Sequence, residues 1–170
     1  MRVLGIDPGT QVMGYGVVEE DEGQLGYIGD GIITPPGELP AKLRGIYDGL
    51  TGLIREYSPE VVAMESPFLA KNVVSTLRLG QVQGVILLTA SHSSLSSFAY
   101  TPMEIKSALA GYGRATKGQV REMVKRLLGL DQPLSLDASD ALAVAICHIH
   151  TAELKGRYQQ HFLPHKSSKR

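Results

Sequence analysis

The sequence is poor in features that indicate a secreted, disulfide-bonded or membrane protein. Its single cysteine, Cys147, excludes a disulfide within the chain and fits a reducing compartment. The N-terminal stretch MRVLGID has no long apolar segment and no small-residue cleavage site, so no secretory signal is predicted. The most apolar later run, VILLTA at 85–90, is too short to span a bilayer. We therefore expect a cytoplasmic protein with no membrane partner.

The chain also lacks net charge, but its charges are unevenly distributed. Hydrophobic residues make up 43% and charged residues 20% of the 170 residues, which is typical of a folded domain. Residues 1–65 contain four Lys or Arg and eleven Asp or Glu, a net charge of −7. Residues 66–170 contain thirteen and six, a net charge of +7. An acidic pocket beside a basic rim fits this distribution, although uneven charge alone is weak evidence for a nucleic-acid partner.

Hydrophobic periodicity divides the chain into strands and helices. Five strands are predicted, at 3–7, 13–18, 25–33, 61–65 and 96–100, with residues 19–23 as a polar hairpin loop. Five helices are predicted, at 39–57, 73–91, 102–110, 117–128 and from 135–137 to about 155. No internal repeat or linker interrupts this order.

This order predicts one α/β domain with a mixed five-stranded sheet flanked by helices. The domain is expected to cover residues 1–155, followed by a flexible basic C-terminal tail at 156–170. The strands at 3–7, 61–65 and 96–100 should be parallel neighbours. Because ligands collect at the carboxyl ends of parallel strands, the strand-terminal Asp7 and Glu65 are candidate site residues.

Two further acids complete a candidate metal site. Asp137 and Asp140 lie three residues apart at the predicted start of the last helix, on one face. If that helix starts at the same sheet edge, four carboxylates converge and repel one another unless a cation lies between them. Oxygen ligands favour Mg²⁺ or Mn²⁺, and two such ions about 3.5–4 Å apart are a recurrent device for phosphodiester hydrolysis.

Each acid also has an ordinary structural explanation. Aspartate before Pro-Gly favours a turn, Asp137 suits a helix N-cap, and Asp140 suits the helix dipole. For a single acid, a structural role is commoner than a catalytic one. Two apolar strands that both end in an acid, however, favour a metal site. His148 and His150 point to different faces of their helix, so no zinc site is predicted there.

Four stretches together resemble the RuvC family of bacterial Holliday junction resolvases, in order over residues 2–152: GIDPGTQVMGYGVV, MESPFLAKN, GYGRATKGQV and DASDALAVAICH. The resemblance implies a ribonuclease H-like fold, a homodimer and Mg²⁺-dependent cleavage of four-way DNA junctions. Paired symmetric nicks would leave 5′-phosphate and 3′-hydroxyl ends. It also implies two Mg²⁺ ions per subunit, for which Mn²⁺ can substitute, and work alongside the RuvA–RuvB branch-migration complex.

The resemblance assigns roles to individual residues. The family's catalytic, metal-binding acids match Asp7, Glu65, Asp137 and Asp140, with Asp7 as the ligand shared by both ions. The position of Asp137 is not always an aspartate in the family. Phe68 matches the aromatic that stacks on a base at the opened crossover, although it fits equally well as an anchor of its loop.

Basic residues in the second half match or extend a DNA-binding surface. Lys106 and Lys117 match lysines that the family places near the scissile backbone, where they would contact phosphate. Arg114 and Arg121 extend this basic patch with less specificity. A solvated helix charge is the ordinary role of a lone lysine. The sequence Ser66-Pro67 after Glu65 departs from some relatives and would stiffen the loop that contains Phe68.

Glycines mark two places of close packing. Gly14 and Gly16, within a predicted strand, leave room for another backbone. Gly80 and Gly84 form a smooth face on the helix at 73–91, for a dimer contact or for packing within the domain.

Three other functions compete with a junction endonuclease. GIDPGT also resembles the phosphate loop of actin-like and sugar-kinase domains, but that class needs a second domain and phosphate loop. A non-catalytic DNA-binding module would have lost the acids, all of which are present. Another ribonuclease H-like nuclease, acting on RNA or RNA–DNA hybrids, would share the fold and the metal site.

Overall fold

Five strands form one mixed sheet. The structure, a computed structural model, describes residues 1–66 and 73–162. The strands lie in the order β3-β2-β1-β4-β5. Strands β1, β2 and β3 pair antiparallel, whereas β4 is parallel to both β1 and β5. Their bounds are β1 Arg2–Asp7, β2 Met13–Asp21, β3 Gln24–Ile33, β4 Val61–Glu65 and β5 Ser96–Tyr100. The predicted mixed sheet and the parallel trio are confirmed.

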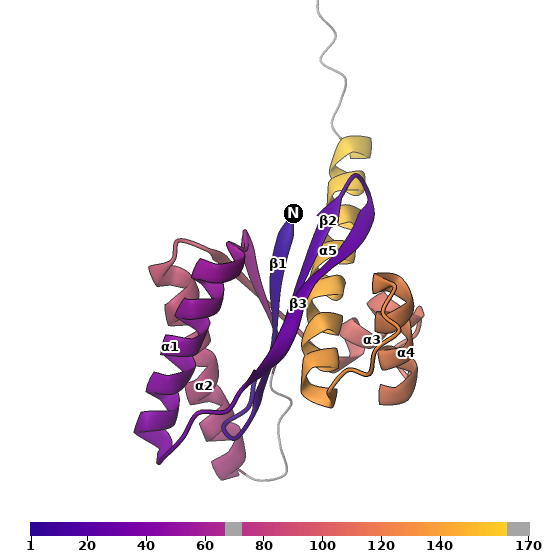
Figure 1. The fold of residues 1–170 in the computed structure, drawn as a ribbon. Helices are drawn as coiled ribbons and strands as arrows, with labels where there is room; N and C mark the ends of the chain where they lie inside the picture. Colours follow the sequence, from indigo (N-terminus) through magenta and orange to yellow (C-terminus); the bar gives the residue numbers. More distant parts are fainter. Residues whose placement is uncertain (67–72, 163–170) are drawn as a thin grey trace, which may run out of the picture.

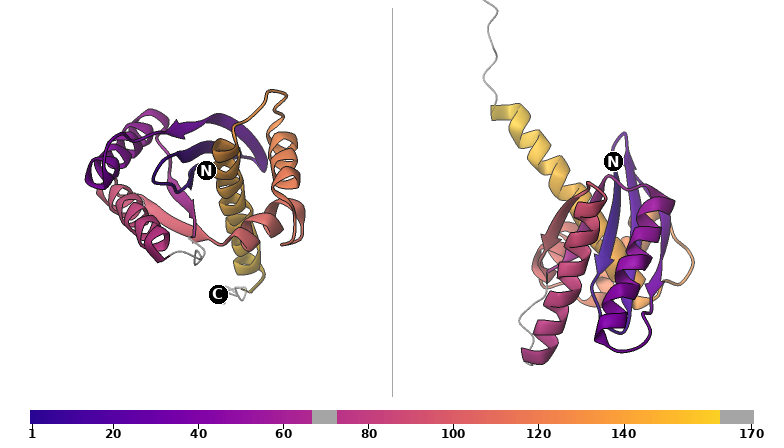
Figure 2. Two further views of the ribbon diagram at one scale, coloured as in Figure 1. Left: turned by 90° about the horizontal axis from the view of Figure 1, so that it is seen from below. Right: turned by 90° about the vertical axis from the view of Figure 1, so that its left-hand side faces the viewer.

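The helices cover both faces of this sheet (Figures 1 and 2). Helices α1 (Leu39–Tyr57) and α2 (Val73–His92) lie on one face. Helix α5 (Leu136–Phe162) crosses the other face, and α3 (Pro102–Ala110) and α4 (Lys117–Leu128) pack against it. The result is the three-layered α/β arrangement of a ribonuclease H-like fold.

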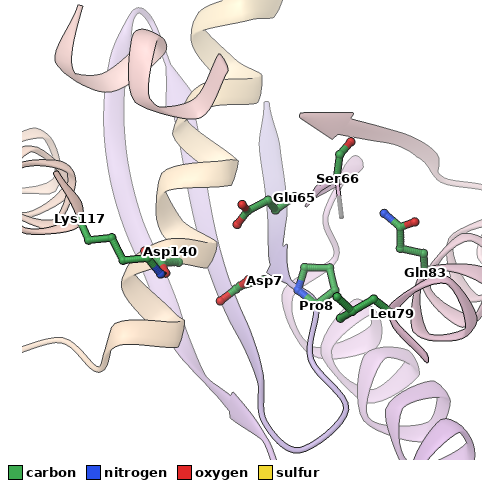
Figure 3. Close-up of a pocket in the computed structure, with 8 residues that line it drawn as sticks. All are labelled: Asp7, Pro8, Glu65, Ser66, Leu79, Gln83, Lys117 and Asp140. Carbon is green, nitrogen blue, oxygen red and sulfur yellow. The ribbon is translucent and has the colours of Figure 1, made fainter. Parts of the chain in front are cut away.

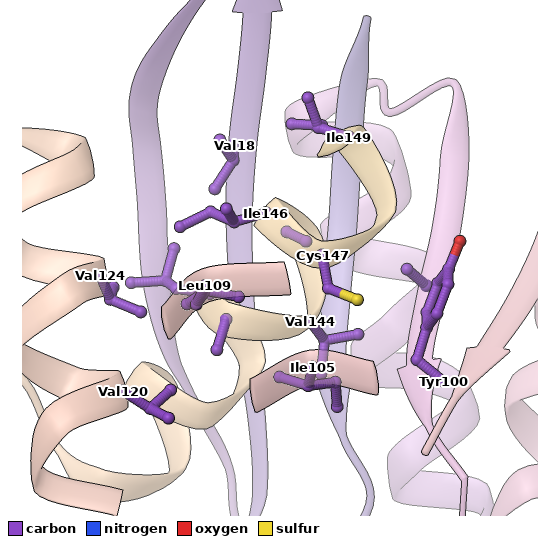
Figure 4. Packing of buried hydrophobic residues seen from close by; sticks show 14 of the residues in the cluster. Val18, Tyr100, Ile105, Leu109, Val120, Val124, Val144, Ile146, Cys147 and Ile149 are labelled. Atoms are coloured by element: carbon purple, nitrogen blue, oxygen red, sulfur yellow. The ribbon is translucent and has the colours of Figure 1, made fainter. Parts of the chain in front are cut away.

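Alternation along the central strands decides which side chains enter which layer. In β1, Leu4 and Ile6 join the core beneath α1 and α2, whereas Val3 joins the core beneath α5. In this second core, Val18 of β2 lies beside Ile146 of α5 (Figure 4). Strand β4 alternates in the same way. By this period of two, the terminal residues Asp7 and Glu65 fall on the α5 side of the sheet.

Helix α5 approaches the sheet closely because glycines lie beneath it. A Cβ atom on Gly5 would lie 2.1 Å from the carbonyl oxygen of Ala141, and one on Gly14 would lie 2.1 Å from that of Asp137. A Cβ atom on Gly16 would also collide with α5. The predicted close approach at Gly14 and Gly16 is confirmed, and it holds the start of α5 at the carboxyl end of β1.

Substitution of Gly5 by alanine is expected to lower the free energy of unfolding by about 3 kcal/mol, because α5 must shift away from the sheet. Urea unfolding followed by circular dichroism measures the change. The control is Gly52→Ala in α1, where an added Cβ meets nothing within 4 Å. This control should gain roughly 0.5–1 kcal/mol through helix propensity. Equal stability of Gly5→Ala and the unmodified protein would contradict the close approach.

Two element boundaries differ from the sequence prediction. The hairpin loop is only Glu22 and Gly23, not residues 19–23, since both have positive φ and form the tight turn that two twisted strands prefer. Helix α5 continues to Phe162, beyond the predicted end near Lys155. The sequence supplies no proline before Pro164 to stop it.

Helix α2 is unusually apolar for its exposure. Among the described residues, it is the one helix whose length and composition would allow a membrane span, with a mean hydropathy of 1.3. Core helices meet the same criteria, and α2 buries Val82, Ile86 and Ala90 against the sheet layer. One such helix is weak evidence for a membrane. A Cβ atom on Gly80 or Gly84 meets nothing within 4 Å, so these glycines do not serve packing within the described chain.

Candidate active site

The sheet presents two carboxylates at one edge. Strand β1 ends at Asp7 and the parallel strand β4 ends at Glu65. Ile6 is the register partner of Met64, so the next residue along each strand reaches the same edge. Both side chains fall on the α5 side by strand alternation. The convergence predicted for these two acids is confirmed.

Helix α5 adds the third carboxylate. Ser135 Oγ accepts a hydrogen bond from the backbone N–H of Ala138 at 3.2 Å, so Ser135 caps the helix, rather than Asp137. Asp137 lies in the first turn, and Asp140 follows one turn later. Since glycines allow this end of α5 to lie against β1 and β2, Asp140 reaches the cavity that contains Asp7 and Glu65.

These three acids line one cavity of about 250 Å³ (Figure 3). Their side chains approach from β1, β4 and α5, three elements far apart in sequence. Lys117 enters from α4. The remaining lining residues are Pro8, Ser66, Leu79 and Gln83. Leu79 and Gln83 lie one turn apart on α2 and close the side opposite α5.

Lys117 forms an ion pair with Asp140. Its Nζ donates a hydrogen bond to Asp140 Oδ2 at 2.9 Å, which raises the pKa of Lys117. The Lys117 side chain is 76% exposed, whereas that of Asp140 is 22% exposed. Thr116 and Gln119 form a capping box at the start of α4, which fixes the position of Lys117 as its first residue.

The cavity holds more negative charge than the lysine offsets. Burial, together with the nearby Glu65 and Asp140 carboxylates, raises the pKa of Asp7 from 3.8 to about 7. Asp137 adds a smaller effect in the same direction, and Lys117 opposes it. Burial and Asp140 also raise the pKa of Glu65. A further positive charge would therefore stabilise the ionised site.

The donor set fits a hard divalent cation. All three acids offer carboxylate oxygen, the ligand type that Mg²⁺ and Mn²⁺ prefer. Within the described ranges, no three His, Cys, Asp or Glu side chains are grouped closely enough to hold a metal ion as they stand. In this arrangement the Lys117 ammonium is the cation partner of Asp140. Asp137 does not line this cavity, and its charge makes a smaller contribution to the raised pKa of Asp7.

A second cavity of about 230 Å³ continues from the first and brings in Lys106. The two cavities share Glu65, Lys117 and Asp140. Lys106 lies on α3, whose start is fixed by the capping box of Thr101 and Glu104. Its charge opposes the rise in the pKa of Glu65. The structure thus places both predicted lysines beside the acids.

The two predicted arginines lie outside both cavities. Arg114 is exposed between α3 and α4, and Arg121 is half-buried on α4. Neither lines the two cavities that contain the acids. Phe68 lies outside the described residues, so its stacking role stays a prediction. The sequence reasoning missed Gln83, whose spacing of four from Leu79 was the available signal.

Comparisons with known proteins agree with this geometry. The family model for crossover junction endodeoxyribonuclease RuvC matches residues 3–148. A protein of that name from Pelobacter propionicus is 44% identical over 170 residues, covering 99% of this chain and 96% of the relative. Another from Dehalococcoides mccartyi is 51% identical over 151 residues, covering 87% and 92%.

Solved structures give the same result. Thermus thermophilus RuvC in complex with a Holliday junction substrate superposes with a TM-score of 0.86 at 31% identity, covering 91% of this chain and 96% of that one. The yeast mitochondrial Holliday junction resolvase Ydc2 has the same fold, with a TM-score of 0.70 at 18% identity and coverage of 95% and 84%. With a family match across most of its length and relatives near half identical, the chain belongs to the RuvC family of crossover junction endodeoxyribonucleases.

Proposed function

We propose that this protein is a structure-specific endonuclease that resolves four-way (Holliday) DNA junctions in recombination and repair. The observation that supports it most is one cavity of the family fold that holds Asp7, Glu65, Asp140 and Lys117. Relatives are named for crossover junction cleavage, and one of them is solved with a Holliday junction substrate. A non-catalytic module would not need these acids. Action on RNA–DNA hybrids is not favoured by these relatives.

Asp7, Glu65 and Asp140 are the proposed ligands of two Mg²⁺ ions per subunit, with Asp137 as a further ligand. The charges of Glu65, Asp140 and Asp137 all raise the pKa of Asp7. Asp7 is therefore the proposed ligand shared by both ions. Mg²⁺ held by these acids would supply an activated water and would stabilise the leaving 3′ oxygen. Mn²⁺, which also prefers oxygen ligands, is expected to substitute.

The basic side chains position the DNA in this proposal. Lys106 and Lys117 border the acids and are proposed to contact the scissile phosphate and its neighbours. Arg114 and Arg121 contact the backbone further away. Phe68 is proposed to stack on a base at the opened crossover.

The active unit is proposed to be a homodimer joined through α2. Val73, Leu77 and Leu87 are exposed on this helix, and the exposed Gly80 and Gly84 lie on the same stripe. Apolar or small residues thus recur at alternating intervals of four and three, the spacing of a helix–helix contact. A two-fold enzyme would offer two matched sites to a junction of approximate two-fold symmetry.

Substitution of Leu77 by glutamate is expected to convert the dimer to a monomer, because a charge would be buried between the two α2 helices. Sedimentation velocity should show twice the 18.3 kDa chain mass for the unmodified protein and one chain mass for the variant. Leu154→Glu is the matched control, since Leu154 is also more than half exposed but lies on α5. An unmodified protein that sediments as a monomer would contradict the dimer. If the unmodified protein instead partitioned into a detergent phase, the exposed apolar face of α2 would be assigned to membrane binding.

A cleavage assay tests the function itself. The protein is given a synthetic four-way junction, a matched linear duplex and an RNA–DNA hybrid, each with Mg²⁺ or with EDTA. Paired symmetric nicks in the junction, with Mg²⁺ and not with EDTA, are expected. Cutting of the hybrid alone would make the protein a ribonuclease. Junction binding with no cutting under either Mg²⁺ or Mn²⁺ would remove the catalytic role.

The cellular setting follows from the same function. We place the protein in the cytoplasm, where it would act with the RuvA–RuvB branch-migration complex on junction DNA. The nuclease domain is proposed to be residues 1–155, with 156–170 as a basic tail that is not required for folding. Helix α5 extends past that boundary, so truncation after residue 155, followed by thermal unfolding, tests where the domain ends.

A further inference from the structure

Two basic side chains lie on the side of the catalytic cavity opposite Lys106 and Lys117. Arg78 comes from α2 and Lys42 from α1. Both border the loop after Asp7, at Thr10 and Gln11. The proposed chemistry gives neither side chain a role.

The cavities in this region follow one another across the molecule. The catalytic cavity includes Leu79, and a neighbouring cavity of about 410 Å³ shares Leu79 and adds Thr10, Gln11 and Arg78. A further cavity of about 210 Å³ shares the last three residues and adds Lys42. At the opposite end, the cavity with Lys106 shares three residues with the catalytic one. The acids therefore lie in the middle of a row of adjoining cavities, referred to below as the groove, with basic residues at both ends.

The local contacts hold one of these cations in place over the loop. Lys42 Nζ donates a hydrogen bond to Gln11 Oε1 at 2.6 Å. Among the described residues, no carboxylate forms an ion pair with Lys42 or Arg78, whereas Arg44, on the same helix as Lys42, pairs with Asp48 at 3.5 Å.

One acid shares this end of the groove. Glu38 lines the cavity that contains both cations. Its single charge leaves an excess of one positive charge there. Because Glu38 is exposed, its carboxylate can turn toward water. An anion at this end therefore meets two cations that have no carboxylate partner among the described residues.

We propose that Arg78 and Lys42 bind backbone phosphates of the DNA strand where it leaves the catalytic cavity, opposite Lys106 and Lys117. The inference rests on the proposed junction nuclease function and adds a second phosphate-binding end to the site. A strand that crosses the acids has phosphates on both sides of the scissile one. Contacts at one end alone would let the strand pivot, whereas contacts at both ends fix its register.

Junction binding in EDTA, measured across a salt series, tests this phosphate site without cleavage. Arg78→Ala and Lys42→Ala should each weaken binding roughly tenfold at low salt. Each should also reduce the slope of log affinity against log salt by about 0.7–0.9, because one phosphate is no longer neutralised by the protein. Arg44→Ala, which removes a cation outside the groove, should change neither quantity. Slopes equal to that of the unmodified protein in both groove variants would overturn the proposal.

Neutral methylphosphonate linkages, placed one at a time along the junction strands, locate the phosphate that each cation binds. At one phosphate near the cleavage site, the neutral linkage should weaken junction binding by the unmodified protein. The same linkage should not weaken binding by Arg78→Ala any further. At saturating junction with Mg²⁺, both groove variants should still cleave, with a loss of rate no larger than their loss of affinity. A large loss of rate with unchanged affinity would overturn the proposal and place Arg78 in the chemistry. If the unmodified protein binds no junction at all, the proposed function fails as well.

Discussion

Replacement of Asp7 by asparagine is expected to abolish junction cleavage while leaving junction binding largely intact. Asp7 is the last residue of the central strand, and the charges of the other acids of the site all raise its pKa. The amide keeps the shape of the side chain but removes the charge that a divalent cation needs. The loss of rate should be roughly 10⁴-fold or more, the size seen when a residue essential to a catalytic unit is removed. Single-turnover cleavage with Mg²⁺, beside junction binding in EDTA, separates the two effects.

The same substitution should stabilise the metal-free protein in a pH-dependent way. The pKa of Asp7 is about 7 in the fold against 3.8 in the unfolded chain. Because the folded pKa is raised, the native state binds the proton more tightly and loses stability as pH rises from about 4 to 7. Asparagine does not titrate and escapes this loss. The variant should therefore gain roughly 2–4 kcal/mol over the unmodified protein above pH 7, and little near pH 4.

Urea unfolding in EDTA at pH 5, 6, 7 and 8 measures this difference. Asp48→Asn is the matched control, because Asp48 is an exposed acid on α1 whose ion pair, in the described part of the chain, is with Arg44 one helical turn away. Its effect should stay within about 0.5 kcal/mol and should not grow with pH. If Asp7→Asn were less stable than the unmodified protein at pH 8, Asp7 would have a structural task in the strand-end turn. Full cleavage activity in the variant would remove Asp7 from the site.

The sequence was sufficient for the sheet and for the three acids. Apolar runs that end in Asp7 and Glu65 mark parallel strands, and a strand end is a fixed point of the fold. Asp140 follows from its place at the start of a long helix. Each of these predictions depends on local periodicity, which indicates where a strand or helix begins and ends. The order of these elements along the chain then indicates where their terminal acids lie in the fold. The resemblance added the function, because periodicity does not distinguish one nuclease of this fold from another.

What the sequence did not predict depends on contacts between distant elements. The ion pair of Lys117 with Asp140 depends on the angle at which α4 packs against α5. Gly5 matters because a helix from the far end of the chain crosses it, and no local pattern indicates that crossing. The groove that joins Arg78 to the acids arises from side chains of separate helices. The end of α5 was missed because nothing in its sequence marks a stop before Pro164.

Replacement of Lys117 by glutamine is expected to lower the cleavage rate about 10²–10³-fold with little effect on stability. Lys117 lines both cavities that contain the acids and pairs with Asp140. Removing a cation that faces the scissile phosphate withdraws charge stabilisation from the transition state, which accounts for a rate loss of this size. Since the side chain is largely exposed, its ion pair should contribute less than about 1 kcal/mol to folding.

The pH dependence distinguishes this role from a structural one. The pKa of Lys117 is raised above its usual 10.5, so its stabilising effect is present throughout the neutral range and is lost only as pH rises beyond that value. Because Lys117 lowers the pKa of both Asp7 and Glu65, the glutamine variant in EDTA should continue to lose stability at higher pH than the unmodified protein. Lys125→Gln, a lysine on α4 outside both cavities, should leave rate and pH profile unchanged. A stability loss well above 1 kcal/mol in Lys117→Gln, with cleavage reduced only in proportion to the folded fraction, would assign Lys117 to holding α4 against α5.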